Sequence, residues 1–376
     1  MTICYFSAQY LPTVGGVERY TWNLARKTVA AGHRAIVVTS ALPGLPDRET
    51  DADGIEIFRL PVWPVMKGRF PVLRPGKVFG SLTRELWAQN IDFCVIQTRM
   101  YVQSVWAARA AHRRGIPALV IDHSTGYMPM GGGVLGAAGR LYEQLACAVI
   151  KAQRPAFYGV SAAVCRWLKQ GFGIDAAGCL PNAVDPAALE ALRPGKDWRA
   201  ALGLAPGTPL VAYVGRLIPE KGAAALAEAV KTLSGTALAI AGDGPLLAAL
   251  QGMGAPVYPL GNLPYEDTIA LLWQADVYCL PTRYGEGFPT TLLEAAACRC
   301  PIVCTPTAGT EELLAGGDCG VLLEDVSPAA IAAGLRQVLE DKPRAAAMAQ
   351  NAHRNLCAAF TWDAVSQKVL ALAEQR

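Results

Sequence analysis

The feature that most constrains this chain is an alternation of short apolar segments with longer helical ones, which occurs separately in each half. Short runs rich in Val, Ile and Ala are typical of strands buried on both faces, and strands that alternate with helices indicate a parallel sheet. The segments expected to form strands are 3–7, 35–39, 55–60, 93–97, 118–121 and 156–160 in the first half, and 209–215, 237–242, 257–260, 277–280 and 301–304 in the second.

A turn-rich segment separates the two halves. Residues 180–186 read Leu-Pro-Asn-Ala-Val-Asp-Pro, and Pro, Asn and Asp all favour turns. A length of 376 residues also exceeds what one ordinary core holds. We therefore expect two Rossmann-like α/β domains, at 1–182 and 183–360, with a ligand in the cleft where the strands end.

Composition excludes several other classes of protein. With 52% hydrophobic and 17% charged residues, the chain is not disordered. Its start lacks the basic region of a secretory signal, and its best apolar run, 134–150, is broken by Arg140 and Glu143, so we expect no spanning helix. Eleven scattered cysteines fit reduced thiols in the cytosol, and we interpret Cys298, Cys300 and Cys304 as buried apolar groups. We expect a cytoplasmic protein without a metal or other cofactor.

The charge is unevenly distributed. Residues 1–180 carry a formal charge of +9 and residues 181–376 carry −6. This asymmetry predicts that the first half meets an anionic partner. The net charge of +3 is too small to indicate nucleic acid.

Two loops have the residue types that bind phosphate. Gly15 and Gly16 precede a helix, where bare backbone and the helix dipole favour an anion, although a plain tight turn fits equally. In the segment 213–222, Arg216 and Lys221 follow a strand and lead into a helix. They predict a diphosphate clamp that needs no metal, the alternative being a solvated surface loop.

The segment 284–294, Tyr-Gly-Glu-Gly-Phe-Pro-Thr-Thr-Leu-Leu-Glu, predicts a helix that begins near Pro289. Its first amides can receive phosphate oxygens. Glu294 is placed to accept ribose hydroxyls and Glu286 to reach sugar hydroxyls, or both simply complement the helix dipole. The helix-start residues expected to contact these phosphate oxygens are Phe288, Pro289, Thr290 and Thr291.

Taken together, these motifs resemble family 4 of the retaining glycosyltransferases, which have the GT-B fold of two facing Rossmann-like domains. The resemblance rests on Gly-Gly-Val-Glu-Arg at 15–19, Leu-Pro-Asn-Ala-Val-Asp at 180–185, Gly-Arg-Leu-Ile-Pro-Glu-Lys-Gly at 215–222, Ala-Gly-Asp-Gly-Pro-Leu at 241–246 and Glu-Gly-Phe-Pro-Thr-Thr-Leu-Leu-Glu at 286–294. The motifs stand in the family's order and extend across nearly the whole chain.

The resemblance implies roles for individual positions. Arg216 and Lys221 would bind the donor diphosphate, with Gly15 or Gly16 contacting it from the first domain. The turn with Asn262 and Leu263 would abut the base, Glu294 would hold the ribose, and Glu286 would meet the transferred sugar. His123 matches the active-site histidine, although a lone histidine is more often structural. The segment 361–376 resembles the helix that closes back onto the first, acceptor-side domain.

The acceptor is expected at the first domain. Residues 63–77 set Lys67, Arg69, Arg74 and Lys77 among apolar groups, which fits an anionic membrane surface or a lipid phosphate, or else an irregular solvated loop. Lys67, Arg69 and Arg99 are candidate acceptor ligands.

The predicted function is transfer of a hexose or N-acetylhexosamine from a UDP- or GDP-sugar to a lipid-linked or cell-envelope glycan, in polysaccharide biosynthesis. The alternatives are a non-catalytic nucleotide-sugar-binding protein and a nucleotide-sugar epimerase. A cytoplasmic protein that contacts the inner face of the cell membrane, or one that does not, fits this function.

Two short segments depart from simple expectations. Where the family usually has Ala-Cys-Gly-Cys, this chain has Arg299, which we expect to point to solvent. Asp51-Ala-Asp53 has the form of a metal-binding motif, but its polar flanks and Gly54 predict a turn.

Overall fold

The computed structural model describes residues 1–13, 15–66, 68–128, 131, 133–283, 285 and 287–375. They form two compact units. Unit 1 comprises Met1–Pro181 with Trp362–Arg376, and unit 2 comprises Asn182–Thr361.

Unit 1 is built on one eight-stranded sheet in the order β10-β9-β8-β7-β1-β2-β4-β3. All neighbouring strands are parallel except β3 and β4. Because β1 is central and the chain leaves it first to one side and then to the other, the order reverses between β1 and β7, where α/β sheets bind ligands. The strands are β1 (Thr2–Phe6), β2 (Arg34–Ser40), β3 (Arg48–Thr50), β4 (Glu56–Leu60), β7 (Phe93–Gln97), β8 (Ala118–Asp122), β9 (Ala156–Gly159) and β10 (Gly178–Cys179).

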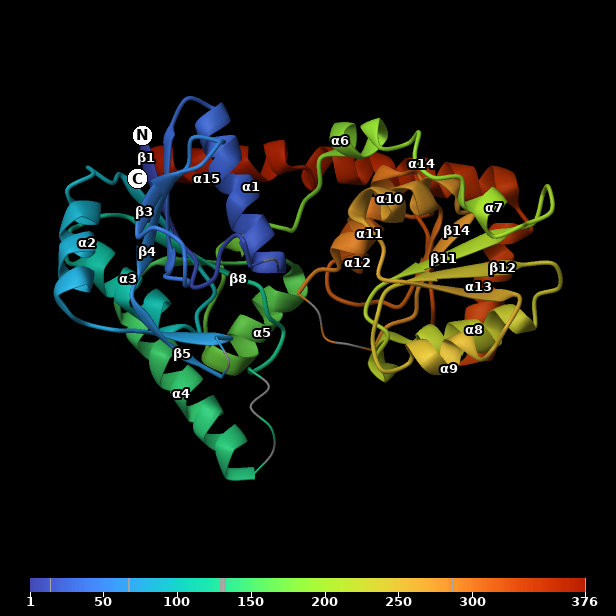
Figure 1. Ribbon diagram of the computed structural model, residues 1–376, viewed down its shortest axis with the longest axis horizontal. Coiled ribbons are helices and arrows are strands. Elements are labelled where there is room, and N and C mark those ends of the chain that lie inside the picture. Colours follow the sequence, from blue (N-terminus) through green and yellow to red (C-terminus); the bar gives the residue numbers. More distant parts are fainter. Residues whose placement is uncertain are drawn as a thin grey trace. The chain divides into compact units, whose positions relative to one another are not determined.

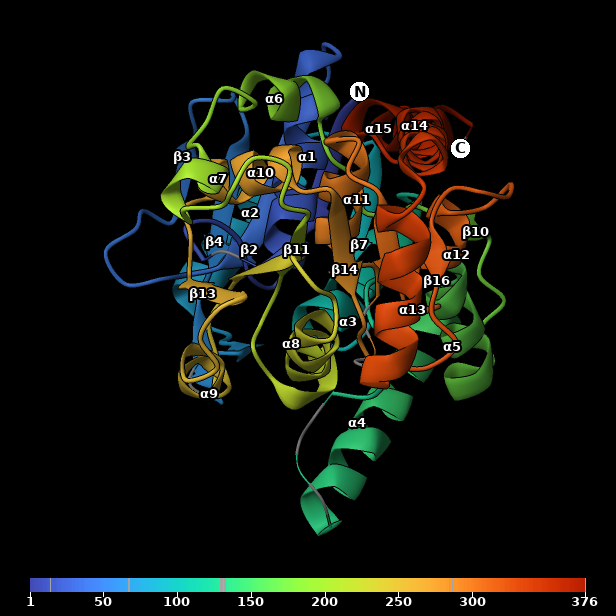
Figure 2. The ribbon, with the colours of Figure 1, turned by 90° about the vertical axis from the view of Figure 1, so that its right-hand side faces the viewer.

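Helices pack on this sheet, and the last helix of the chain returns to it (Figure 1). That helix, α15 (Trp362–Glu374), lies beside α1 (Gly16–Ala30), as Figure 2 also shows. Trp362 meets the Tyr20 ring edge-on with centroids 5.3 Å apart, and Asp363 pairs with Lys27 at 2.7 Å. The other helices of unit 1 are α2 (Lys77–Trp87), α3 (Val102–His112), α4 (Gly133–Ala152) and α5 (Ala162–Phe172).

Capping residues fix where several helices begin and end. The Ser161 side chain accepts a hydrogen bond from Val164 N and starts α5, and Gly173 ends it in the left-handed conformation at φ 60°. Asp185 and Ser327 cap later helices in the same way. These are the residue types that sequence reasoning expects at helix starts.

The segment 63–77 is more regular than the irregular loop that we kept as one alternative. It contains an antiparallel hairpin of β5 (Val62–Val65) and β6 (Phe70–Leu73), followed by the start of α2. The turn is tied to unit 1 because Gln9 Nε2 donates to Gly68 O at 2.9 Å. Trp63, Val65 and Met66 are left exposed on it.

Unit 2 has a six-stranded, wholly parallel sheet in the order β13-β12-β11-β14-β15-β16. The strands β11, β12 and β14 are almost entirely buried, and the order reverses between β11 and β14. The strands are β11 (Leu210–Val214), β12 (Ala237–Ala241), β13 (Val257–Gly261), β14 (Val277–Leu280), β15 (Ile302–Cys304) and β16 (Val321–Leu322). The helices are α6 (Pro186–Ala191), α7 (Trp198–Ala201), α8 (Ala223–Lys231), α9 (Leu247–Gln251), α10 (Tyr265–Gln274), α11 (Thr290–Ala297), α12 (Thr310–Leu313), α13 (Pro328–Leu339) and α14 (Lys342–Ala359), with a 3-10 turn at Pro219–Lys221.

The segments at Arg299 and at Asp51–Asp53 are both explained by their backbone geometry. Arg299 adopts φ 51°, the left-handed region that glycine favours, which accounts for the glycine usual there in the family. Its side chain is exposed and pairs with Glu190 at 3.2 Å. Asp51 Oδ1 accepts hydrogen bonds from the amides of Asp53 and Ile55, so this segment is a turn, as predicted.

Candidate active site

In unit 2, the reversal of strand order brings the loops after β11 and β14 together. The carbonyl of Glu220, in the first loop, accepts hydrogen bonds from Arg283 N at 2.7 Å and Thr282 Oγ1 at 3.3 Å, both in the second. Thr282 is fixed in turn by Thr305 Oγ1, which donates to its carbonyl at 2.6 Å. The predicted cation loop and the predicted helix-start loop therefore lie side by side at one edge of the sheet.

Glycines allow these loops to touch through bare backbone. Gly222 has φ +76°, and a Cβ there would overlap Pro281 O. Gly242 has φ +145°, and a Cβ there would overlap Gly215 O. Any side chain at these two positions would push the loops apart, so the motif glycines are explained by close backbone approach.

The two residues predicted to bind a diphosphate lie in one loop, but their side chains differ in exposure. Arg216 is exposed directly after the end of β11, whereas Lys221 is only 5% exposed in the 3-10 turn before α8. Burying an ammonium group costs free energy unless charge or hydrogen bonds compensate it. Its position at the carboxyl ends of the strands, where open α/β sheets bind ligands, keeps Lys221 a candidate for diphosphate binding.

The start of α11 leaves backbone amides for a ligand. Its N-cap is Pro289, whose side chain makes no capping hydrogen bond. The carbonyl of Phe288 accepts a hydrogen bond from Asn182 Nδ2 at 2.8 Å, and the hydroxyl of Thr291 bonds to Tyr278 Oη at 2.7 Å. Uncapped first-turn amides can bind phosphate oxygens, and Thr290 is the first helical residue here.

The predicted ribose and base contacts are linked through Tyr265, which sequence reasoning missed. Tyr265 Oη donates to Glu294 Oε1 at 3.2 Å, and Glu294 is 7% exposed. Tyr265 begins α10, immediately after the turn that holds Asn262 and Leu263. A tyrosine two residues beyond the predicted base turn was the available signal. Glu286, predicted to meet the transferred sugar, lies outside the described residues.

In unit 1, the predicted acceptor ligand Arg99 is completely buried. It donates to Asp122 Oδ2 at 2.6 Å and to Glu143 Oε2 at 3.0 Å, and both carboxylates are 0% exposed. Its guanidinium also lies over the Phe172 ring at 4.3 Å. The acceptor role predicted for Arg99 does not fit this burial, because the side chain has no accessible surface to offer a ligand.

Arg99 instead holds the loop after β8 in place. Its Nη1 donates to Ser124 Oγ at 2.9 Å, and Glu143 Oε1 accepts from Met128 N at 2.6 Å. Desolvation raises the pKa of Glu143, although the Met128 amide and Arg99 act in the opposite direction. The preceding residue, Thr98, has φ 62°, which costs a β-branched residue about 1–3 kcal/mol and marks this strand end as strained. The network thus positions the loop that carries His123.

His123 is half-buried directly after β8. Its Nε2 lies 2.8 Å from Gln97 Oε1, and its ring meets Tyr20 edge-on with centroids 4.8 Å apart. Burial lowers the pKa of His123 to about 4, and Asp122 opposes this shift. The imidazole is therefore neutral near pH 7. Gln97, at the end of β7, is a second residue that sequence reasoning missed.

This lowered pKa predicts a specific loss of stability in acid. The ordinary pKa of histidine is 6.5, so as pH falls the unfolded chain binds a proton at this site before the folded chain does. We expect the stabilisation that is present above pH 6.5 to be lost as pH falls to 4, by at most about 3 kcal/mol. Urea unfolding of wild type and His123→Gln between pH 4 and 7 measures it, since only the wild type has this titration. Parallel pH dependences would contradict the prediction.

Gly15 and Gly16 lie at the start of α1 as predicted, but a carboxylate lies against Gly15. An ideal Cβ on Gly15 would overlap Glu18 Oε2. Glu18 is 7% exposed, and burial raises its pKa. An anion bound by these glycine amides would meet this carboxylate, which must then move or bind a proton. Glu18 was available from the sequence as the acidic residue in the first helical turn.

Arg69 is exposed on the turn before β6, and Lys67 lies outside the described residues. Across the described ranges, no three His, Cys, Asp or Glu side chains are grouped to hold a metal ion. Nor does any helix there have both the length and the apolar character needed to cross a membrane.

Comparison with known proteins identifies the family. Residues 14–188 match the model of "Glycosyltransferase Family 4", and residues 195–355 match "Glycosyl transferases group 1". The two matches are in sequence order and leave unmatched only 1–13, 189–194 and 356–376. The chain belongs to glycosyltransferase family 4. It is a retaining glycosyltransferase that uses a nucleotide-sugar donor, so the prediction of a glycosyltransferase is confirmed.

Individual relatives support the same family and fold. A glycogen synthase of Mycobacterium tuberculosis is 27% identical over an alignment of 399 residues, gaps included. The alignment covers 97% of this chain and 92% of the relative. A GDP-mannose-dependent alpha-(1-6)-phosphatidylinositol monomannoside mannosyltransferase of Mycolicibacterium smegmatis is 34% identical over 191 residues, 43% of this chain and 50% of that one. The solved sucrose-phosphate synthase of Thermosynechococcus elongatus has a TM-score of 0.77 at 20% identity, covering 100% and 98% of the two chains. The predicted GT-B fold is thereby confirmed.

Proposed function

We propose that this glycosyltransferase moves a hexose or N-acetylhexosamine from a UDP- or GDP-sugar to a lipid-linked glycan acceptor of the cell envelope, working at the inner face of the cell membrane. The observation that carries the acceptor class is an exposed apolar surface on unit 1 that is flanked by basic residues. The donor class rests on the loops of unit 2.

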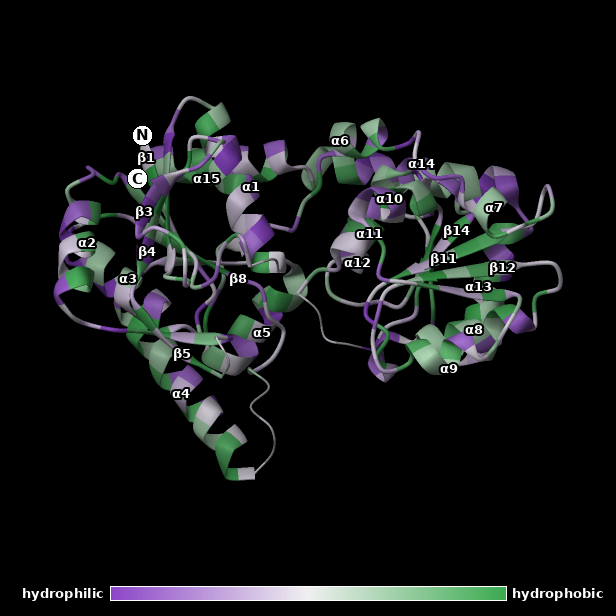
Figure 3. Ribbon diagram, viewed as in Figure 1, coloured by the Kyte–Doolittle hydropathy of each residue, from purple (hydrophilic) through white to green (hydrophobic). Residues whose placement is uncertain are grey.

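The apolar surface follows one side of α4. Val134, Leu135, Leu141 and Leu145 are 88%, 61%, 61% and 59% exposed. Positions 134, 138, 141, 145 and 148 recur at helical spacing and are all apolar and exposed. Helix α4 extends away from the rest of unit 1 (Figures 1 and 2). Apolar residues continue to its outer end (Figure 3).

Basic residues accompany this surface. The exposed charged residues of α4 are Arg140 and Lys151, whereas its one carboxylate, Glu143, is buried against Arg99. In the sequence, 57–84 contains six Lys and Arg and no Asp or Glu, and its hairpin exposes Trp63 at 50%. Exposed leucines and tryptophan among cations are typical of protein that lies in an anionic membrane interface. A lipid-linked acceptor is found at such an interface.

The proposed mechanism rests on the charge that develops on the donor during the reaction. Breaking the sugar–phosphate bond places negative charge on the departing diphosphate. Arg216, Lys221 and the first amides of α11 supply preorganised positive charge for it, which is usually the largest catalytic contribution. We propose Glu294 as the ribose ligand and neutral His123 as a group that holds the sugar. The acceptor hydroxyl attacks the front face, and its proton passes to the leaving phosphate.

A vesicle experiment tests the acceptor class. We expect the protein to sediment with vesicles that contain phosphatidylglycerol but not with neutral phosphatidylcholine vesicles. The double variant Leu141→Ser/Leu145→Ser should lose this binding, whereas Leu322→Ser, a comparably exposed leucine on unit 2, should retain it. UDP- and GDP-sugars, each with a lipid-linked and a soluble saccharide acceptor, identify the donor by product formation. Transfer only to soluble acceptors, with no vesicle binding, would refute the proposal.

A further inference from the structure

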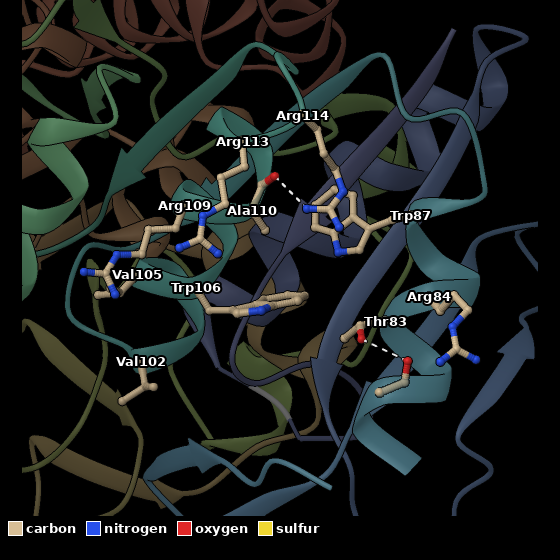
Figure 4. Close-up of a pocket in the computed structure, with 11 residues that line it drawn as sticks. Thr83, Arg84, Trp87, Val102, Val105, Trp106, Arg109, Ala110, Arg113 and Arg114 are labelled. Atoms are coloured by element: carbon tan, nitrogen blue, oxygen red, sulfur yellow. Dashed lines mark hydrogen bonds between the residues drawn. The ribbon is translucent and has the colours of Figure 1, made fainter. Parts of the chain in front are cut away.

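Unit 1 has a cavity of about 550 Å³ between α2 and α3, lined by none of the residues assigned to donor binding or catalysis (Figure 4). Arginines and tryptophans from both helices and from the residues just after α3 surround it. They are Arg84, Trp87, Trp106, Arg109, Arg113 and Arg114. We call this cavity the arginine–tryptophan pocket.

The aromatic part of the pocket is firmly packed. The Trp87 and Trp106 rings lie 5.9 Å apart, tilted by 53°. Phe6, at the end of the central strand β1, contacts both of them, at 6.0 Å and 5.9 Å. Phe79 packs against Trp106 at 5.7 Å. The indole rings therefore form a preorganised apolar surface that has no need to rearrange for a ligand.

The arginines form an uncompensated positive cluster. Arg114 lies over the Trp87 ring at 4.3 Å and donates to Ala110 O at 3.0 Å, which fixes its direction. Within the described part of the chain, none of the four guanidinium groups pairs with a carboxylate, and no acidic residue lines the pocket. Elsewhere in unit 1 exposed arginines do have such partners, as Arg34 has in Glu56 at 2.6 Å.

Helix dipoles account for only part of this cluster. Arginines near a helix C-terminus gain from the dipole, and these lie in or just after the last turns of α2 and α3. Each C-terminus is equivalent to roughly half a negative charge, so two helices offset about one of the four positive charges. Arg109 and Arg113 are also four residues apart, a spacing at which like charges repel. An anionic ligand would relieve the remaining repulsion.

We propose that the arginine–tryptophan pocket binds a small anionic saccharide, a phosphorylated or carboxylated sugar, as a site separate from the donor site. Guanidinium groups bind phosphate and carboxylate oxygens through paired hydrogen bonds, and the indole rings offer an apolar surface to the sugar ring. A cavity of this volume is within the size range of small-molecule sites. The inference goes beyond the proposed transfer reaction and does not depend on it.

Calorimetric titration of the full-length protein with glucose 6-phosphate, glucuronate, glucose and inorganic phosphate tests the proposal. We expect saturable binding of one or both anionic sugars, weaker binding of inorganic phosphate, and none of glucose. Which anionic sugar binds distinguishes phosphate from carboxylate. Binding should weaken with salt and persist in the presence of saturating UDP or GDP.

The double variant Arg109→Gln/Arg113→Gln should weaken binding about tenfold or more, because each lost charge-assisted hydrogen bond lowers affinity. Both side chains are exposed, so the fold should be unaffected. Arg193→Gln is the matched control, since Arg193 is an exposed arginine that lies over Trp273 in unit 2. Equal loss in the control, displacement by the nucleotide, or phosphate binding as tightly as the sugars would overturn the proposal. So would arginine-dependent binding to anionic vesicles without any binding of free sugars.

Discussion

Lys221→Ala is expected to lower kcat by about 10²–10³-fold while leaving the fold intact, because one preorganised cation at a developing anionic charge is worth about that much in rate. Lys221 is nearly buried at the edge of the unit 2 sheet, next to the loops with which Arg216 and the start of α11 would contact a diphosphate. Removing its charge leaves the leaving group less stabilised. Product formation with the donor identified in the sugar screen measures the effect.

Ligand-induced thermal stabilisation distinguishes a loss of diphosphate binding from a general loss of folding stability in the variant. A nucleoside diphosphate that binds only the folded wild type raises its melting temperature, and the shift should be smaller in the variant. Lys231→Ala is the matched control, because Lys231 is an exposed lysine at the end of α8 in the same unit. If Lys221→Ala retained both wild-type kcat and the full shift, the diphosphate clamp would be wrong.

Arg99→Met is expected to destabilise the protein by about 3–5 kcal/mol, because it leaves buried carboxylates without their cation. Asp122 and Glu143 are both fully buried against Arg99. Methionine fills much of the volume but supplies no hydrogen bond. Urea unfolding followed by a probe of unit 1 measures the change.

Two comparisons make the result specific. Arg48→Met removes an exposed pair with Glu56 at 3.2 Å, and it should cost no more than about 1 kcal/mol. Adding Asp122→Asn and Glu143→Gln to Arg99→Met should recover part of the loss, since the uncompensated charges are then gone. A loss for Arg99→Met as small as that for Arg48→Met would show that the buried network contributes little.

Much of the fold followed from local patterns. The six strands expected in the first half and the five in the second all form, because a buried parallel strand is recognisable from its own short apolar run. The short edge strands β3, β10 and β16 were missed, since two or three residues do not carry a pattern. The turn at Asp51 was also predictable, because its hydrogen bonds stay within four residues.

The loops of the candidate site were predictable for a related reason. Gly222 and Gly242 mark places where backbone meets backbone, and each stands within a recognisable motif beside a strand end. Motif order therefore identified the cation loop and the helix-start loop before their contact was known. Their adjacency through Glu220 follows from strand order, which the alternation of strands and helices already implies.

What the sequence determined by itself was the succession of strands and helices, the phosphate-binding loops and the family, because each depends on residues close together in the chain. Only the tertiary structure decided the role of Arg99, whose partners are 23 and 44 residues away and turn a candidate ligand into a buried anchor. The same holds for the exposed side of α4 and the arginine–tryptophan pocket. Whether a leucine or an arginine is covered depends on which distant element packs on it, and no local pattern contains that information.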